Sequence, residues 1–210
     1  MLQHSVVRSI AKRPVVLAIP RAVWVARYLS SCPEEATEEP AWNAFDVLGV
    51  PERFSIDETQ LKNNYRKLMG EYHPDRFQQA SAVDQDSMQE KSSAVTQAYQ
   101  ELLSPHTRAA HIMALRGKPM TETLSQQVVG MDFLMEIMEI REVVDNVADG
   151  SDQELHKLLA ENEHRLDATC EELEKALKHG DLDDALKHTA RLQYWNRVIE
   201  TIREKMENVA

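Results

Sequence analysis

Apolar side chains recur three or four residues apart along most of this chain, which is the spacing of one face of an α-helix. A first short run, Trp42, Phe45 and Leu48, is closed by Gly49-Val50-Pro51. A later helix is opened by Pro105 and ends at Gly117. Between them lie two longer stripes, made of Leu61, Tyr65, Leu68, Met69 and Tyr72, and of Met88, Val95, Ala98, Tyr99, Leu102 and Leu103.

Local signals mark both ends of the first long helix. It begins either at Ser55 with Glu58 or at Asp57 with Gln60, because both pairs fit a capping box. At its other end stands His73-Pro74-Asp75. Because a proline disfavours helical geometry at the residue before it, we expect this tripeptide in a turn between two antiparallel helices.

Three further helices are predicted from Met131 onward, separated by two stop signals. Gly150-Ser151 and Gly180-Asp181 each combine a glycine that ends one helix with a residue that caps the next. Such short connections favour an antiparallel three-helix bundle. The residues expected in its core are Phe133, Ile137, Ile140, Val144 and Val147, then Leu155, Leu158, Leu159, Leu166, Cys170, Leu173 and Leu177, then Leu182, Leu186, Leu192, Trp195, Ile199 and Ile202.

The first helix of this bundle has more apolar surface than one core stripe needs. Leu134, Met135 and Met138 lie off the stripe, beside the charged Glu139 and Glu142. An apolar patch rimmed by charges suggests a surface where another protein docks. The alternative is a broad helix face buried against the N-terminal helices.

Composition supports helices and excludes several classes of protein. The 210 residues are 42% apolar and include only 6 glycines and 8 prolines, which favours an all-α fold over a turn-rich β fold. The most apolar run, residues 15–19, is far shorter than the roughly 20 residues of a membrane-spanning helix. Two cysteines, Cys32 and Cys170, are too few for a disulfide framework or a four-ligand zinc site. We therefore expect no metal and no cofactor.

Charge is distributed unevenly along the chain. The 24 basic and 35 acidic residues give a net charge of −11, which argues against nucleic acid as a partner. Five of the bases and none of the acids precede Glu34, so the other 19 bases and 35 acids give the rest of the chain −16. A basic segment without acids is typical of a mitochondrial transit peptide, expected over 1–31, with a disordered basic tail as the alternative. The acidic stretch ending in Pro40 indicates a spacer over 32–41.

A basic cluster precedes His73-Pro74-Asp75. Lys62, Arg66 and Lys67 lie 11, 7 and 6 residues before the histidine, off the apolar stripe of the same helix. A helical hairpin with this tripeptide at its loop and these bases closely resembles the J-domain of DnaJ-type co-chaperones, which we expect over 42–116. The resemblance implies contact with the ATPase domain of a DnaK-type chaperone. The residues it implies, here called the HPD surface, are Lys62, Arg66, Lys67, His73, Pro74, Asp75 and Arg76.

A catalytic dyad of His73 and Asp75 is the alternative for this tripeptide. No serine or cysteine nucleophile lies near it in the sequence, and nothing suggests a substrate pocket. We therefore expect a protein that is not an enzyme and that stimulates the ATPase of its partner.

From residue 42 to 208 the chain resembles the HscB (Hsc20-type) family of J-protein co-chaperones, which act in iron–sulfur cluster assembly. The matching segments are His73-Pro74-Asp75-Arg76-Phe77, Pro105-His106-Thr107-Arg108-Ala109, and Phe133-Leu134-Met135-Glu136 with Glu139, Arg141 and Glu142. The resemblance implies a connector over 117–127 and a scaffold-binding bundle over 128–208. The positions that bind the cluster scaffold protein, here called the scaffold-facing set, are Leu134, Met135, Met138, Glu139, Glu142 and Tyr194.

The resemblance implies a co-chaperone of the mitochondrial matrix. It would bind the scaffold with its bundle, deliver it to a dedicated DnaK-type chaperone and stimulate ATP hydrolysis to promote cluster transfer, with no nucleic acid or membrane as partner. Some animal and plant members carry two Cys-x-x-Cys pairs before the J-domain, and this sequence has neither, so no zinc is expected. The alternative is a mitochondrial J-protein for another client, in an import motor or in respiratory-complex assembly.

Overall fold

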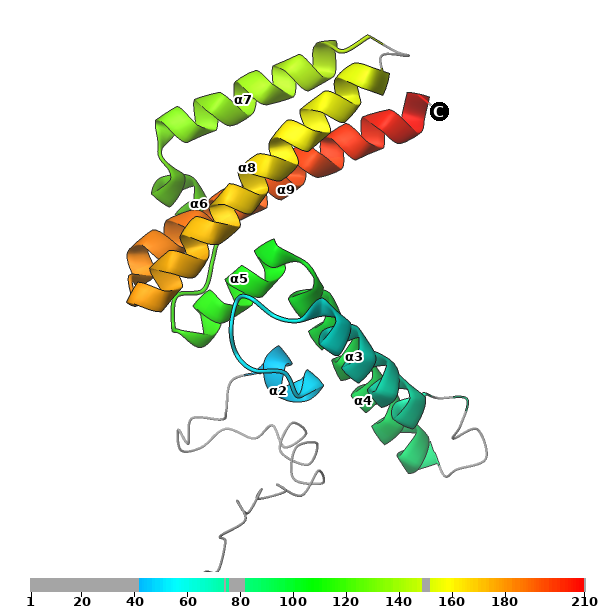
Figure 1. Ribbon diagram of the computed structural model, residues 1–210. Helices are drawn as coiled ribbons and strands as arrows, with labels where there is room; N and C mark the ends of the chain where they lie inside the picture. Colours follow the sequence, from blue (N-terminus) through cyan, green and yellow to red (C-terminus); the bar gives the residue numbers. More distant parts are fainter. Residues whose placement is uncertain (1–41, 74, 76–81, 149–151, 210) are drawn as a thin grey trace, which may run out of the picture. The chain divides into compact units, whose positions relative to one another are not determined.

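The structure is a computed structural model that describes residues 42–73, 75, 82–148 and 152–209 (Figure 1). In these ranges the regular elements are helices and no strand occurs, so the prediction of an all-α fold is confirmed. The expected transit peptide and spacer lie outside the described residues, as does the Gly150-Ser151 stop signal. Among the helices that are described, none is long and apolar enough to span a membrane.

The first two helices start and stop where polar residues and glycine dictate. In α2 (Ala44–Leu48), the Asn43 side chain accepts a hydrogen bond from the Phe45 N–H at 3.0 Å, and Gly49 ends the helix with a φ of 64° that glycine adopts without strain. α3 (Glu58–Tyr72) begins after Asp57, whose Oδ1 accepts from the N–H groups of Thr59 and Gln60 at 2.8 and 3.1 Å. The start signal in use is therefore Asp57 and not Ser55.

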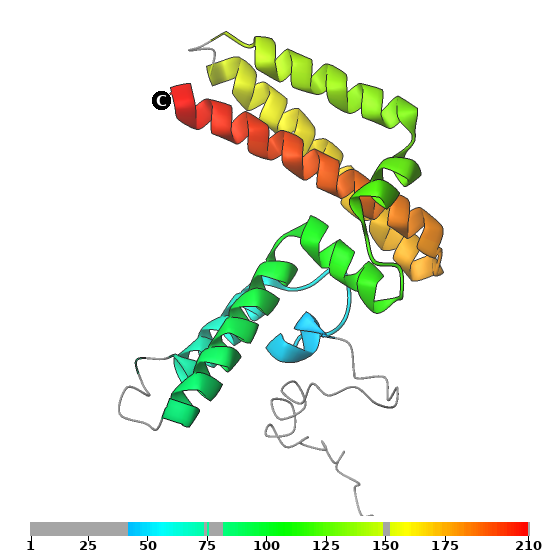
Figure 2. The same cartoon turned by 180° about the vertical axis from the view of Figure 1, so that it is seen from behind.

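The third helix, α4 (Ala82–Leu103), lies side by side with α3 and forms the predicted hairpin with it (Figures 1 and 2). Tyr65 of α3 stacks on Tyr99 of α4 with ring centroids 4.2 Å apart and planes inclined by 20°. The expected burial of Leu103 is wrong, because its side chain is 45% exposed. It follows the buried Leu102 and so points about 100° away from it around the helix.

A buried arginine joins α4 to α5 (Pro105–Leu115). The guanidinium of Arg108 donates to the carbonyl oxygens of Leu102 at 2.8 Å and Leu103 at 3.2 Å, which belong to the last turn of α4. It also donates to the carbonyl oxygen of Phe54 at 3.1 Å, in the loop before α3. These carbonyls have no donor within their own segments, so one side chain satisfies three backbone groups.

The segment expected as a connector contains a helix of its own, α6 (Glu122–Val129). Thr121 caps it by accepting from the Leu124 N–H at 3.2 Å, and Ser125 and Val129 are buried. α6 packs against α9 (Leu182–Val209), and Gly130, with a φ of 80°, separates it from the next helix. An eight-residue amphipathic helix is short enough to pass for a polar linker in the sequence.

The last three helices form the expected bundle. α8 (Asp152–His179) and α9 run side by side, and α7 (Met131–Asn146) lies along them and contacts α9 (Figures 1 and 2). Phe133 and Ile137 of α7 pack with Trp195, Val198 and Ile202 of α9 in one apolar cluster. The predicted core stripe of α7 is therefore confirmed.

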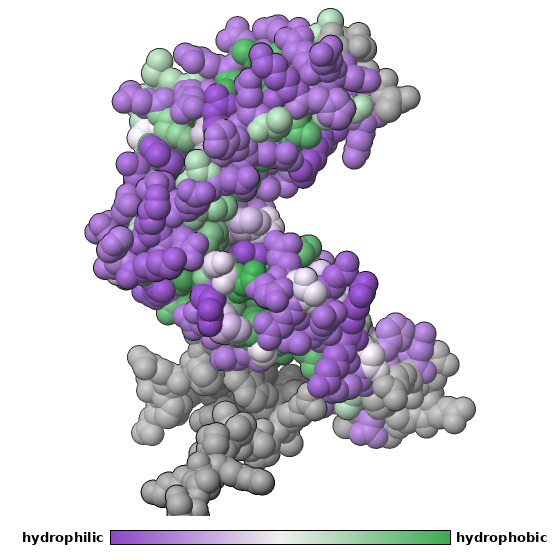
Figure 3. Space-filling view, viewed as in Figure 1, coloured by the Kyte–Doolittle hydropathy of each residue, from purple (hydrophilic) through white to green (hydrophobic). Residues whose placement is uncertain are grey.

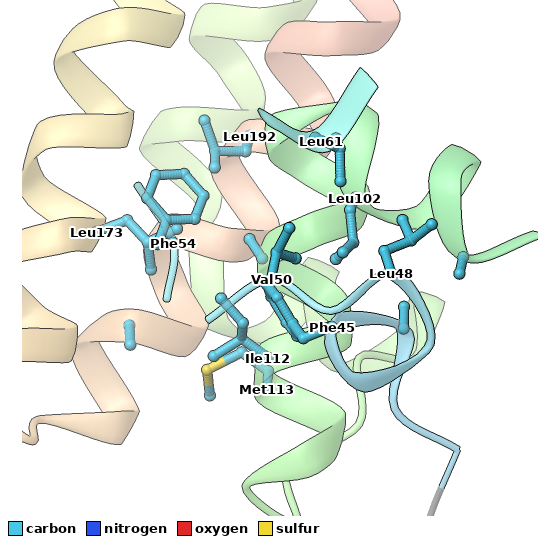
Figure 4. Packing of buried hydrophobic residues seen from close by; sticks show 14 of the residues in the cluster. Phe45, Leu48, Val50, Phe54, Leu61, Leu102, Ile112, Met113, Leu173 and Leu192 are labelled. Atoms are coloured by element: carbon cyan, nitrogen blue, oxygen red, sulfur yellow. The ribbon is translucent and has the colours of Figure 1, made fainter. Parts of the chain in front are cut away.

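One hydrophobic core is shared by the N-terminal helices and the bundle. It contains Phe45, Phe54 and Ile112 from the N-terminal part together with Leu173 of α8 and Leu192 of α9 (Figure 4). All five side chains are buried, Phe54 at 8% exposure being the least so. A continuous hydrophobic core thus joins α5 to α9. Separating α5 from the bundle would expose apolar surface to water.

Candidate functional sites

The first candidate surface is the basic side of α3. Lys62, Arg66 and Lys67 are all exposed, whereas Leu61 on the same helix is buried. None of the three bases forms an ion pair with another residue that the structure describes. Three exposed cations on α3 give this helix a positive surface within an acidic protein.

His73 and Asp75 lie together at the end of that helix. α3 ends at Tyr72, and His73 has extended backbone angles, with φ −61° and ψ 128°, as the following proline predicts. The Asp75 N–H donates to Nδ1 of His73 at 3.3 Å, and Asp75 Oδ2 lies 3.6 Å from the same nitrogen. Pro74 and Arg76, the other residues expected at this end of the HPD surface, lie outside the described residues.

The geometry of His73 and Asp75 suits a contact surface better than a catalytic dyad. Their side chains are 49% and 73% exposed. A catalytic acid–base pair works best in a site that excludes water, because its electrostatic interactions are stronger there. The side chains of His73 and Asp75 are instead exposed to solvent. The arrangement instead presents an imidazole and a carboxylate, close together, to a partner.

The second candidate surface is the outer face of α7. Met131, Met135 and Met138 are 72%, 54% and 70% exposed, and Glu139 and Glu142 beside them are exposed as well. The core stripe lies on the opposite face, with Phe133, Ile137 and Val144 buried. The alternative in which the extra apolar residues are buried against the N-terminal helices is therefore wrong. In Figure 3, green residues interrupt the hydrophilic surface over the part of the bundle where α7 runs.

Two members of the scaffold-facing set lie at the rim of this face. Leu134 and Tyr194 are half-buried and pack against the bundle core. The Tyr194 ring meets the Phe133 ring edge-on, with centroids 5.9 Å apart, so Tyr194 of α9 lies next to the N-terminal half of α7. The fold thus brings Tyr194 close to a helix that precedes it by about 60 positions in the sequence.

Two arginine side chains connect the N-terminal half of α7 to α8 and α9. The Arg191 guanidinium lies over the Phe133 ring, 5.0 Å from its centroid, and Arg165 Nε lies 3.7 Å from Glu136 Oε1. These residues line a shallow groove between α7, α8 and α9. In a cation–π contact of this kind, the ring attracts the guanidinium electrostatically.

Two residues of these surfaces were not predicted from the sequence. Met131, which is 72% exposed, extends the apolar outer face of α7 beyond the scaffold-facing set. The spacing of Met131 from Met135 is one helical turn and could have revealed the first of them. The sequence gives a weaker signal for Arg191. This residue lies about one helical turn before Tyr194, but its contact with α7 can be recognised only when α7 is placed beside α9.

The described cysteine, histidine and acidic side chains offer neither a reactive thiolate nor a cluster of metal ligands. Burial raises the pKa of the Cys170 thiol to about 11, with a further rise from Asp167, so this thiol stays protonated at neutral pH. No group of three or more histidine, cysteine, aspartate or glutamate side chains within the described ranges could hold a metal ion. Cys170 is therefore a half-buried packing residue, and Cys32 lies outside the described residues.

Known families match both parts of the chain. The DnaJ domain family matches residues 43–111, and the family described as HSCB C-terminal oligomerisation domain matches residues 129–203. The mitochondrial J-type co-chaperone jac1 of Schizosaccharomyces pombe is 33% identical over 178 residues, which are 83% of this chain and 76% of that protein.

Two more similarities cover most of the chain. The iron–sulfur cluster co-chaperone protein HscB homolog of Arabidopsis thaliana is 27% identical over 85% of this chain and 69% of that protein. The crystal structure of human co-chaperone protein HscB shares the fold, with a TM-score of 0.73 and 22% identity over 84% of this chain and 94% of that chain. The DnaJ domain and the HSCB C-terminal domain match one after the other along this chain, and the Schizosaccharomyces pombe relative is 33% identical over 83% of it. The chain therefore belongs to the HscB/Jac1 family of J-type co-chaperones.

Proposed function

We propose that this protein is a mitochondrial matrix co-chaperone that binds the scaffold protein of iron–sulfur cluster assembly and delivers it to a DnaK-type chaperone. The observation that carries the proposal is the outer face of α7, where exposed apolar side chains are rimmed by carboxylates on a helix whose opposite face is already packed. Exposed apolar side chains are unfavourable in water, and a partner that covers them removes this free-energy cost. The Arabidopsis relative is named as an iron–sulfur cluster co-chaperone, which supports the choice of partner.

The HPD surface is the proposed contact with the chaperone. Its exposed bases attract an acidic partner surface from a distance, and this attraction weakens as salt screens it. His73 and Asp75 already contact each other in the free protein, so less conformational freedom is lost when they bind. Binding at this surface stimulates ATP hydrolysis by the chaperone, and that hydrolysis locks the chaperone onto the scaffold.

The chaperone's ATPase rate tests this half of the proposal. The rate is measured with wild-type protein, with His73→Gln and with His156→Gln, an exposed histidine on α8 that serves as the matched control. We expect His73→Gln to abolish stimulation and His156→Gln to retain it. Equal stimulation by wild type and His73→Gln would contradict a J-domain mechanism.

The scaffold-facing set is the proposed contact with the scaffold. Burying the exposed side chain of Met138 contributes roughly 1.5–3 kcal/mol, and the half-buried Leu134 and Tyr194 contribute less because part of their surface is already out of water. A micromolar complex requires about 8 kcal/mol, so these three residues supply part of the binding free energy. Glu139 and Glu142 at the rim select a partner with basic groups at matching positions.

The mitochondrial location is supported by two observations. The Schizosaccharomyces pombe relative is named as mitochondrial, and the first 33 residues of this chain hold five bases and no acid. A fluorescent protein fused after residue 41 tests the location. Import of this fusion into mitochondria is expected, and its loss is expected when Arg8, Lys12, Arg13, Arg21 and Arg27 are changed to glutamine.

A further inference from the structure

The methionines of this protein are distributed unevenly between core and surface. Eight of its nine methionines are described, and the only ones among these eight that are exposed are Met131, Met135 and Met138, all on α7. They are spaced four and three residues apart, so their thioethers share one helix face. Met113 of α5, by contrast, is completely buried.

A leucine in these positions would supply the same apolar contact. The thioether adds two properties that leucine lacks: a flexible, polarisable side chain and a sulfur atom that oxidants attack. Exposure decides which sulfur reacts, because an oxidant must reach its lone pair. Met69 also differs from the three methionines of α7 in its contacts. Its sulfur lies 3.7 Å from the Ser92 hydroxyl and 3.8 Å from the Thr96 hydroxyl in the α3–α4 hairpin.

We infer that Met131, Met135 and Met138 form an oxidation site, and that their conversion to methionine sulfoxide by a hydroperoxide switches off docking of the scaffold protein. This inference rests on the proposed function, because two of the three belong to the scaffold-facing set.

The chemical step is an oxygen transfer. The thioether sulfur attacks the protonated oxygen of the hydroperoxide, and an S–O bond forms as the O–O bond breaks. The proton of the attacked oxygen passes, directly or through water, to the departing oxygen, which leaves as water or alcohol. Sulfur loses two electrons and the peroxide gains them. Hydrogen peroxide carries no charge, so the carboxylates of Glu139 and Glu142 do not repel it from the site.

The product changes the docking face without disturbing the fold. A sulfoxide is a strong hydrogen-bond acceptor, and burying it in an apolar interface removes its hydrogen bonds to water. On the free protein the same group stays in solvent, because the three side chains are more than half exposed. Oxidation is therefore expected to weaken binding while leaving the packing of α7 on α9 in place.

Peptide mapping by mass spectrometry tests the selectivity of the site. Full-length protein is treated with hydrogen peroxide, and sulfoxide formation is followed at every methionine. We expect Met131, Met135 and Met138 to be oxidised before Met113. Oxidation of Met113 at the same rate would overturn the assignment of an oxidation site on α7.

Titration of the treated protein with purified scaffold tests the consequence. Oxidised wild type is expected to bind about tenfold more weakly or worse, because a polar group now enters the interface. Methionine sulfoxide reductases A and B together, one for each sulfoxide epimer, are expected to restore binding. Unchanged binding by protein that carries the three sulfoxides would overturn the inference.

A triple substitution supplies the matched control. Met131→Leu, Met135→Leu and Met138→Leu together keep apolar side chains of similar volume and remove the reactive sulfur atoms. The affinity of this variant for scaffold before treatment serves as its own reference, and peroxide treatment is expected to leave that affinity unchanged. A loss on treatment as large as that of wild type would place the damage elsewhere and overturn the inference. If untreated wild type does not bind scaffold, the proposed function fails and the switch fails with it, whereas the peptide map still decides whether α7 carries the oxidation site.

Discussion

Lys205 of α9 donates from its Nζ to the carbonyl oxygen of Val144 at 2.8 Å, near the C-terminal end of α7. The same ammonium donates to the carbonyl oxygen of Asp145 at 2.8 Å. The last carbonyls of a helix have no donor within the helix, and they form the negative end of its dipole. A lysine from another helix both donates hydrogen bonds to these carbonyls and places a positive charge at the negative end. Together with Phe133 at the N-terminal end, this contact fixes α7 to α9 at both of its ends.

Substitution of Lys205 is expected to loosen the end of α7. Lys205→Met keeps the apolar stem and removes the ammonium, and we expect it to lower the free energy of unfolding by about 1 kcal/mol. Urea denaturation measures the loss. Hydrogen exchange of the amides in the last two turns of α7 should become faster, since the carbonyl of Asp145 loses its lysine donor and the carbonyl of Val144 keeps only the Val147 N–H.

The control for this prediction is Lys157→Met on α8. Lys157 is exposed and pairs with Glu161 one turn away at 3.8 Å, a contact worth about 0.3–0.5 kcal/mol. If Lys157→Met destabilises the protein as much as Lys205→Met does, capping of α7 by Lys205 contributes nothing specific.

Loss of the Arg108 guanidinium is expected to destabilise the whole fold. Arg108→Met leaves the carbonyl oxygens of Leu102, Leu103 and Phe54 without a donor in a buried site, which should cost about 3 kcal/mol or more. Arg108→Lys should rescue little, because an ammonium cannot reproduce the planar fork. Chemical denaturation measures both variants, with the exposed Arg116→Met as control. A loss below about 1 kcal/mol for Arg108→Met would contradict the structure.

A largely buried histidine side chain is expected to make the protein less stable in acid. His111 Nε2 accepts from the Ala44 N–H at 3.0 Å, and its Nδ1 lies 3.1 Å from Glu101 Oε2. Burial lowers the pKa of His111 and outweighs the opposite effect of Glu101. Because the folded pKa lies below that of the unfolded chain, the stabilisation is complete above about pH 6.5 and is lost as the pH falls through the folded pKa.

The pH dependence of urea denaturation checks this prediction. Wild type should lose stability between pH 7.5 and pH 5, with help from His106 and His188, whose pKa values burial also lowers. His111→Gln should be less stable at neutral pH and should lose less between the two pH values. An identical pH dependence of wild type and His111→Gln would show that His111 does not contribute.

Periodicity and end signals predicted the described helices other than α6. The stripe of α7 and the stops at Gly49 and Gly180 appear where the sequence places them, because these signals act within a few residues. The choice between Ser55 and Asp57 as cap could not be made from sequence, since both fit the same local rule. α6 escaped prediction because eight residues give only two turns of apolar pattern.

The sites were predictable as far as they depend on one helix. Exposure of Met135 and Met138 follows from their position opposite the core stripe of α7, and the basic side of α3 follows in the same way. The roles of Arg108 and Lys205 depend instead on backbone carbonyls of other segments, and no sequence pattern announces such contacts. The same holds for the edge-on contact of Tyr194 with Phe133, which requires the packed bundle.

Calorimetric titration of the purified scaffold protein into the full chain tests the central claim most directly. Wild type should bind with micromolar affinity, and Met135→Ala with Met138→Ala should weaken binding by about tenfold or more, because two exposed apolar contacts are lost without harm to the fold. The control, Leu103→Ala, removes an exposed apolar side chain from α4 and should bind as wild type does. No binding by wild type, or equal binding by the α7 variant, would contradict the account and favour a J-protein that serves a different client.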